Sequence, residues 1–116
     1  MKILYKNKKV EKVCTDEKEA RKQFGQEVAN KLENVMYLLH TSNNLKDILL
    51  FPQYHLHMLK GNLEGIFSIY LGKTTGYRLL LIPLDENEKL VKSDDMSIYT
   101  KTVCVEIEEV SKHYGK

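Results

Sequence analysis

The sequence has few cysteines, and they cannot form a disulfide or metal-binding framework. Cys14 and Cys104 lie far apart and form no C-x-x-C unit, so we expect two reduced thiols in a cytoplasmic protein. The sequence also lacks any run that approaches the roughly 18 consecutive apolar residues of a membrane span. Its first residues, "MKILYKNKKVEKV", alternate charged and apolar positions, so we expect neither a signal peptide nor a membrane anchor.

The chain has no repeat, linker or low-complexity segment that would divide it. Its 116 residues, 42% of them hydrophobic, suit a single domain over residues 1–116. Such a domain would bury about 65% of the surface of its unfolded chain. The 18 Lys and Arg residues barely exceed the 16 Asp and Glu residues, giving a net charge of +2. This charge is weak support for a polyanionic partner unless the cations cluster in space.

A helical pattern occupies the first half of the chain. Apolar residues recur at steps of three and four from Ala20 to Leu39, which predicts one amphipathic face. Either Thr15 or Asp16 starts this helix, with Glu19 placed to complete a capping box with Asp16. Gly25 predicts a bend between two helical halves. The segment "LKDILLF" predicts a second, short helix.

A β pattern occupies the second half. Alternating or apolar runs bounded by turn residues predict strands at Tyr54–Leu59, Gly65–Leu71, Gly76–Leu84 and Thr100–Val110, after a short strand opened by Lys2, Ile3 and Tyr5. The alternation slips at Glu109 and Val110, which predicts either a bulge or the end of the strand just before "SKHYGK". Helices followed by strands in this order predict an α+β domain, with N-terminal helices packed on one face of an antiparallel sheet.

Two histidines, His55 and His57, would share one face of a regular strand and could form a metal pair. The third ligand would have to be His113 or a distant carboxylate, and no spacing fixes such a site. We therefore predict no metal and no cofactor. The histidines are then either partly exposed sheet residues or a phosphate contact.

Several cations have both a functional and a structural interpretation. Arg78 begins an apolar strand, where a guanidinium must be paired or open to a cleft. It either forms a salt bridge to Glu106 or Glu108, or it is a functional residue that faces a cleft. Lys60, at a strand end, has the same two interpretations. The lysines that follow the first strand either contact phosphate or form a solvated edge; they are Lys6, Lys8, Lys9 and Lys12.

The last residues of the chain add groups that transfer protons. His113 and Tyr114 follow the final strand, and in isolation they could be an unimportant chain end. Cleavage of RNA by its own 2′-hydroxyl needs a proton acceptor, a proton donor and cations that stabilise the phosphorane, but no metal. Lys60, Arg78, His113 and Tyr114 would supply these groups if the sheet brings them together.

Three segments together resemble the HigB branch of the RelE/ParE superfamily, the toxin halves of bacterial type II toxin–antitoxin pairs. They are "HLHMLKGNLEGIFSIYL", "GYRLLLIPL" and "VEIEEVSKHYGK". The helical "KEARKQFGQEVANKLENVMYLL" also fits, so the resemblance covers nearly the whole chain. It implies a RelE-like, microbial-RNase-like fold whose concave sheet face cuts mRNA in the ribosomal A site.

The resemblance also implies roles for single residues. Arg78 would stabilise the transition state, Lys60 would be a further cation, and His113 with Tyr114 would form the acid–base region. RNA contacts would come from four residues: His55, His57, Lys9 and Lys112. Near its end the chain reads Lys112-His113-Tyr114, where the HigB pattern has Asp-Tyr-His. Which of His113 and Tyr114 moves the proton therefore stays open.

The implied partner is a HigA-like helix-turn-helix antitoxin, in a complex expected to be a heterotetramer. The substrate would be mRNA on the ribosome, and operator DNA would be reached only through the antitoxin, because this chain has no DNA-reading helix of its own. Two other functions stay open. One is a ParE-like inhibitor of gyrase without nuclease activity, and the other is an inactive interaction domain in which Arg78 is only salt-bridged.

Overall fold

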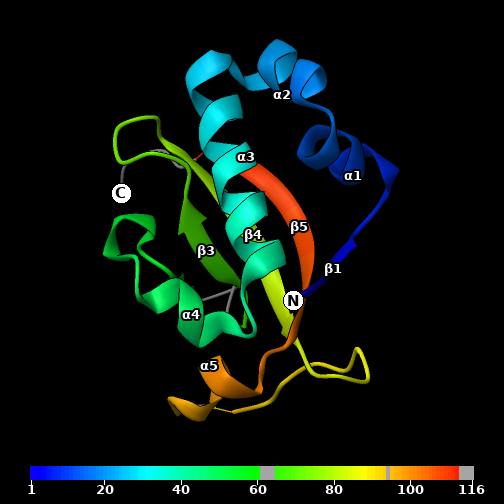
Figure 1. Ribbon diagram of the computed structural model, residues 1–116, viewed down its shortest axis with the longest axis vertical. Helices are drawn as coiled ribbons and strands as arrows, with labels where there is room; N and C mark the ends of the chain where they lie inside the picture. Colours follow the sequence, from blue (N-terminus) through cyan, green and yellow to red (C-terminus); the bar gives the residue numbers. More distant parts are fainter. Residues whose placement is uncertain (61–64, 94, 113–116) are drawn as a thin grey trace.

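The computed structural model describes residues 1–60, 65–93 and 95–112, and it shows helices packed on one face of a sheet (Figure 1). The strands are β1 (Lys2–Tyr5), β2 (His57–Met58), β3 (Phe67–Tyr70), β4 (Tyr77–Leu84) and β5 (Cys104–Lys112). The helices are α1 (Lys8–Thr15), α2 (Glu17–Phe24), α3 (Gln26–Thr41), α4 (Leu45–Leu49), α5 (Ser97–Lys101) and a 3-10 turn, η1 (Pro52–Tyr54). The predicted α+β class is confirmed.

The strands form one sheet in the order β1-β5-β4-β3-β2. The pairs from β2 to β5 are antiparallel, as predicted, but β1 runs parallel to β5. The prediction of a fully antiparallel sheet is wrong at this edge. A parallel partner lies about a hundred residues along the chain, so no turn or local pattern signals it.

One face of the sheet packs against α3, which crosses in front of β4 and β5 (Figure 1). The strand residues in this contact are buried and apolar: Phe67, Ile69, Leu79, Leu81, Val105 and Ile107. They meet the apolar face of α3, which contributes Leu32, Val35 and Leu39. Side chains alternate between the two faces of a strand. The residues between these apolar positions therefore point to the opposite face, which we call the polar face.

The predicted helical region is confirmed with one change. The Asp16 carboxylate accepts hydrogen bonds from the backbone N–H groups of Lys18 and Glu19, at 3.1 and 3.3 Å, as expected of the N-cap of α2. Gly25 has φ +90° and divides the region into two helices, α2 and α3. The sequence did not predict α1, in which only Val13 is fully buried.

The strand predicted at Tyr54–Leu59 is mostly wrong. Pro52 starts a 3-10 turn because its ring presets φ, and His55 ends that turn in the left-handed region at φ +46°. Only His57 and Met58 pair with β3. The strands predicted at Gly65–Leu71 and Gly76–Leu84 are confirmed, as β3 and β4.

The last predicted strand starts later than expected, because α5 occupies Ser97–Lys101 and β5 begins at Cys104. The register shifts between Leu80 and Leu81 of β4, which leaves Glu108 as an extra residue in β5. Of the two predicted alternatives, the structure has a bulge next to the expected position, and the strand continues to Lys112. In the described part of the chain, no helix is both long and apolar enough to cross a membrane.

Candidate functional site

The polar face carries two of the residues that the sequence analysis selected, Arg78 and His57. Tyr70, Arg78 and Ser111 are direct cross-strand neighbours on β3, β4 and β5. A second row contains His57 and Ser68, which pair between β2 and β3. The face thus places a guanidinium, an imidazole, a phenol and two hydroxyls on neighbouring strands.

Arg78 has spare hydrogen-bonding capacity. Its Nε atom is buried and has no hydrogen-bond partner, and it forms no ion pair with any described carboxylate. Glu106 pairs with Ile82, four residues along β4 from Arg78. Four strand residues span about 13 Å, so this carboxylate is far from the start of β4. The salt bridge considered from the sequence is therefore not formed in the described structure.

The two histidines lie together beside Tyr70. The ring centroids of His55 and His57 are 4.5 Å apart, and those of His55 and Tyr70 are 4.7 Å apart. His57 Nδ1 lies 2.8 Å from the backbone carbonyl of His55 and must carry the proton to donate there. In the neutral imidazole Nε2 is then the acceptor. The rings meet because the backbone of His55 is in the left-handed region, not because both residues belong to a regular strand.

A strip of polar rings therefore runs from β2 to Arg78. It contains His57, His55 and Tyr70, and Tyr70 adjoins Arg78 across the β3–β4 pair. Among the described residues, no group of three His, Cys, Asp or Glu side chains is arranged to hold a metal ion. This strip can offer proton acceptors and donors beside a cation.

The other predicted cations lie elsewhere. Lys60, predicted to be catalytic, is exposed just after β2, level with the start of β3, whereas Arg78 pairs with Tyr70 at the end of β3. Lys112 is opposite Tyr77, and its Nζ lies 5.4 Å from the centre of the Tyr77 ring, on the helix-covered side. Lys9 is exposed on α1, which lies near β1 at the other edge of the sheet from β2 (Figure 1). The structure therefore does not bring Lys9 or Lys112 to Arg78.

His113 and Tyr114, the predicted acid–base pair, lie outside the described residues. Ser111, the cross-strand neighbour of Arg78, precedes His113 by two residues in the sequence. The roles of His113 and Tyr114 stay predictions.

Glu108 is an ionisable residue of the polar face that the sequence analysis did not select. It occupies the bulge of β5, and its Oε2 atom is buried without a hydrogen-bond partner. Burial, together with the nearby Glu106, raises the pKa of Glu108 to about 7, against a smaller opposing effect of Lys6. A carboxyl group with a pKa near neutrality can gain or lose a proton under ordinary conditions. The broken alternation of "EIEE" was the available signal.

Two further residues were missed on β3. Ser68 is fully buried, and its Oγ atom has no hydrogen-bond partner. Tyr70 is the link between the histidines and Arg78. The alternation of "FSIY", with polar atoms at every second position, was the signal for both.

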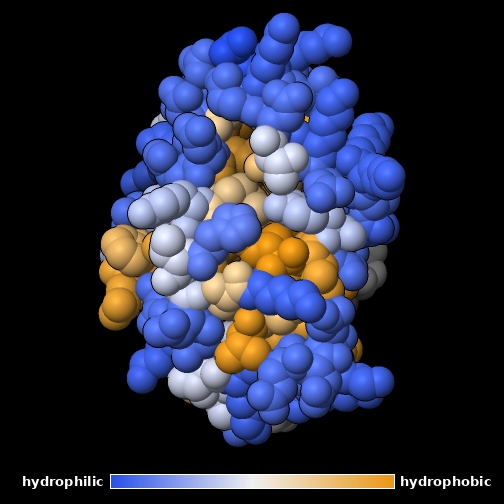
Figure 2. Space-filling view, turned by 45° about the vertical axis from the view of Figure 1, so that its right-hand side comes forward, coloured by the Kyte–Doolittle hydropathy of each residue, from blue (hydrophilic) through white to orange (hydrophobic). Residues whose placement is uncertain are grey.

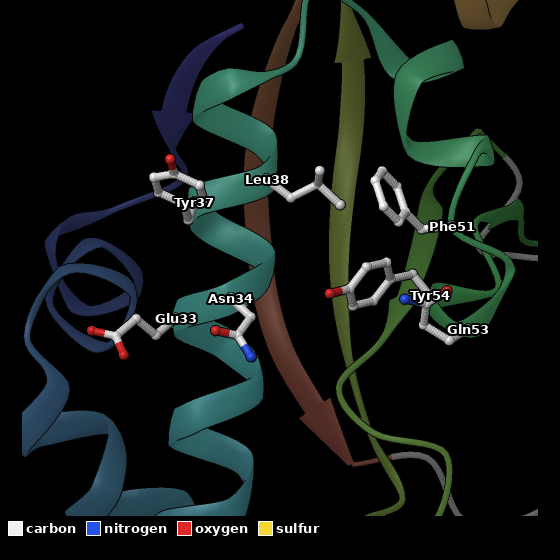
Figure 3. A pocket seen from close by; sticks show the side chains of 7 residues that line it. All are labelled: Glu33, Asn34, Tyr37, Leu38, Phe51, Gln53 and Tyr54. Carbon is white, nitrogen blue, oxygen red and sulfur yellow. The ribbon is translucent and has the colours of Figure 1, made fainter.

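Two cavities differ in character. The smaller, of about 220 Å³, adjoins Arg78 at the ends of β3 and β4 and is lined by Tyr70, Gly72, Lys73, Thr74, Gly76, Tyr77 and Arg78. The larger, of about 530 Å³, lies between α3 and the segment around η1 and is lined by Glu33, Asn34, Tyr37, Leu38, Phe51, Gln53 and Tyr54. In the larger cavity Leu38, Phe51 and Tyr54 point toward one another (Figure 3). It offers mainly apolar contacts and no acid–base pair.

The molecular surface shows a similar division. In the turned view of Figure 2, the end that carries α1 and α2 is hydrophilic, whereas hydrophobic residues gather over the middle and lower parts. Large apolar or aromatic side chains that are strongly exposed include Leu50, Tyr37 and Met96. Exposed apolar patches of this kind often mark contacts with other proteins.

Comparison with protein-family models and with curated protein sequences gives no match. Among solved structures, the chain is similar to the YoeB/ParE toxin from Agrobacterium tumefaciens, with a TM-score of 0.51 and 12% sequence identity. The similarity covers 98% of this chain and 100% of that chain. At this identity the comparison establishes the architecture alone, so the HigB branch stays a prediction. The chain has an α+β fold like that of a YoeB/ParE toxin.

Proposed function

We propose that the protein is the toxin of a type II toxin–antitoxin pair and a ribosome-dependent mRNA endoribonuclease. The observation that carries this proposal is Arg78, whose Nε is buried without a partner on the polar face. Stabilising a phosphorane requires a fixed cation with unused donors. Tyr70 and the two histidines beside it add groups that bind RNA or transfer protons.

In this mechanism the 2′-oxygen of one ribose attacks the adjacent phosphorus, and the bond to the 5′-oxygen of the next nucleotide breaks. One protein group takes the proton of the 2′-hydroxyl, and another gives a proton to the departing 5′-oxygen. Arg78 donates to a non-bridging oxygen as negative charge builds there. His113 and Tyr114 divide the proton transfers, and His113→Ala and Tyr114→Phe should each slow cleavage by about 100- to 10,000-fold. The larger loss identifies the main acid or base.

RNA would be held by His55 and His57 beside Tyr70, and by Lys9 and Lys112 at more distant phosphates, whereas Lys60 would be a further cation. A HigA-like helix-turn-helix antitoxin would neutralise the protein and carry the contact with operator DNA. This assignment comes from the resemblance in sequence and is supported by the similarity in fold to a YoeB/ParE toxin.

The direct test is cleavage in a cell-free translation system. We expect mRNA to be cut only when ribosomes are present, because a net charge of +2 leaves naked RNA weakly bound and poorly oriented. Toeprinting locates the cuts. A chelator selective for transition metals, which spares ribosomal Mg²⁺, should leave the activity unchanged. Efficient cutting of purified RNA would contradict ribosome dependence.

A second candidate is a ParE-like inhibitor of gyrase without nuclease activity. It is favoured by the fold, since the similar toxin bears a name that joins YoeB and ParE. A DNA supercoiling assay with purified gyrase separates the two candidates. Inhibited supercoiling with intact mRNA would select the gyrase inhibitor, and cut mRNA with normal supercoiling would select the endoribonuclease.

A further inference from the structure

The cavity of about 220 Å³ beside Arg78 has the charge of an anion site. It lies where β3 turns into β4, and its lining includes two cations, Lys73 and Arg78, but no carboxylate among the described residues. Lys73 is exposed, whereas Arg78 is half-buried with an unpartnered Nε. A ligand in this cavity would meet one solvated and one partly desolvated cation.

The turn that forms the cavity is fixed by its own contacts. The Thr75 hydroxyl donates a hydrogen bond to the carbonyl of Leu71 at 2.7 Å and accepts one from the Tyr77 N–H at 3.0 Å. Gly72 has φ +93°, and a Cβ atom there would lie 2.9 Å from Thr75 Cγ2. The turn therefore requires glycine at this position, and the cavity exists before any ligand binds.

An aromatic wall completes the cavity. Tyr70 lines it, is half-buried, and is held on its other side by His55 at a ring-centroid distance of 4.7 Å. Every nucleobase can stack on such a ring, and Arg and Lys side chains bind phosphate. The volume is below the 300 to 1,000 Å³ typical of pockets that enclose a whole ligand, so only part of a nucleotide would lie inside the cavity.

We propose that this cavity binds a single nucleotide of RNA, with its base against Tyr70 and its phosphate between Lys73 and Arg78. The inference rests on the proposed function, in which this nucleotide adjoins the cleaved bond. It adds a binding role for Tyr70 and Lys73, which the sequence did not indicate. The turn between β3 and β4 then positions the RNA that Arg78 acts on.

The test measures nucleotide binding without ribosomes. Uridine 3′-monophosphate and guanosine 3′-monophosphate are titrated into the full chain, and the backbone amide signals of Gly72, Thr74 and Gly76 are followed by NMR. We expect these signals to shift, with dissociation constants on the order of 1 mM for one stacked base. Inorganic phosphate should bind at least about tenfold more weakly, since it cannot stack.

Variants assign the contacts. Tyr70→Leu should weaken nucleotide binding by about tenfold, whereas Tyr70→Phe keeps the ring and should bind like the unaltered protein. Lys73→Ala should weaken binding by about fivefold. Lys101→Ala, which removes an exposed lysine of α5, a helix that does not line the cavity, should leave binding unchanged.

Two results would overturn the inference: equal binding of phosphate and nucleotide, or unchanged binding by Tyr70→Leu. Cleavage in the translation system is scored separately. Nucleotide binding that needs Tyr70, together with intact mRNA, would reject the proposed endoribonuclease and keep the nucleotide site. Cut mRNA with no nucleotide shifts at this turn would keep the endoribonuclease and reject the site.

Discussion

The two faces of the sheet belong to the same strands, but they differ in whether their buried side chains find suitable partners, apolar contacts on one face and hydrogen bonds on the other. On the helix-covered face, Phe67, Ile69 and Leu79 are fully buried against other apolar side chains. On the polar face, Ser68 Oγ, Arg78 Nε and Glu108 Oε2 are buried without hydrogen-bond partners. Unsatisfied buried polar atoms oppose folding and are rare, so their concentration on one face indicates a binding or catalytic surface. The helix-covered face supplies the stability that the polar face lacks.

The largest expected effect is on the helix-covered face. Phe67→Ala removes a ring with 0% exposure from the centre of the core, so the free energy of unfolding should fall by about 3 to 5 kcal/mol. Urea denaturation followed by circular dichroism measures this loss. A fall below about 1 kcal/mol would show that this face does not dominate stability.

The second effect, on the polar face, should appear in activity alone. Arg78→Ala should reduce cleavage by about 100- to 1,000-fold, a loss of about 3 kcal/mol of transition-state stabilisation, with little change in unfolding free energy. The matched control is Arg21→Ala, which removes the other arginine, on α2, where it pairs with Glu17 at 2.8 Å. Growth arrest, mRNA cleavage and thermal stability are measured for both variants.

Two outcomes would change the assignment of Arg78. Growth arrest at full strength in Arg78→Ala would remove it from the site. Loss of activity only in parallel with unfolding would make its role structural.

A smaller effect is expected from Glu108, which should make the free energy of unfolding depend on pH. Its pKa rises from an ordinary value of 4.5 to about 7 on folding, so the folded state holds its proton more tightly than the unfolded state. Stability should therefore be complete below pH 4.5, decline between pH 4.5 and 7, and level off above. Glu108→Gln should remove this decline, a difference of at most about 1 kcal/mol because the side chain is partly exposed. Melting temperatures across this range test it, and identical profiles would contradict the raised pKa.

The smallest effect on the free energy of unfolding is expected from Ser68, which lies beside Phe67 on β3 but on the polar face. Ser68→Ala removes a buried hydroxyl that has no partner, so the unfolding free energy should stay level or rise by up to about 1 kcal/mol. Its neighbour Phe67, on the other face, gives the opposite result on truncation. Destabilisation by Ser68→Ala above about 1 kcal/mol would mean that the hydroxyl is bonded in solution.

The sequence predicted the elements whose patterns are long and local. The apolar face from Ala20 to Leu39 and the run "YRLLLIPL" both became the expected elements. The helix α1 was missed because "KKVEKVCT" contains too few apolar positions to show a period. The alternation of "YHLHML" suggested a strand, but the preceding proline and the left-handed His55 ended it early.

The site was predicted less completely because it depends on pairing between strands. Arg78 was selected as a cation in an apolar strand, which a single sequence reveals. Tyr70 became relevant only through its register with Arg78, and that register is not visible locally. Glu108 acquires its raised pKa from burial and from Glu106 in the folded bulge. Lys9 was selected by charge alone, and its helix placed it near the other edge of the sheet.

The position of β5 has a consequence for how the chain folds during synthesis. This strand lies between β1 and β4, and it pairs Lys2 with Cys104 and Tyr5 with Ile107. Contacts between segments so far apart in sequence form slowly, because a long loop must close first. While the ribosome makes the chain, β1 has no strand partner until the residues of β5 leave the exit tunnel. The pairing of Arg78 with Ser111 forms in the same step, so a nascent chain whose β5 is still inside the exit tunnel cannot carry a finished site.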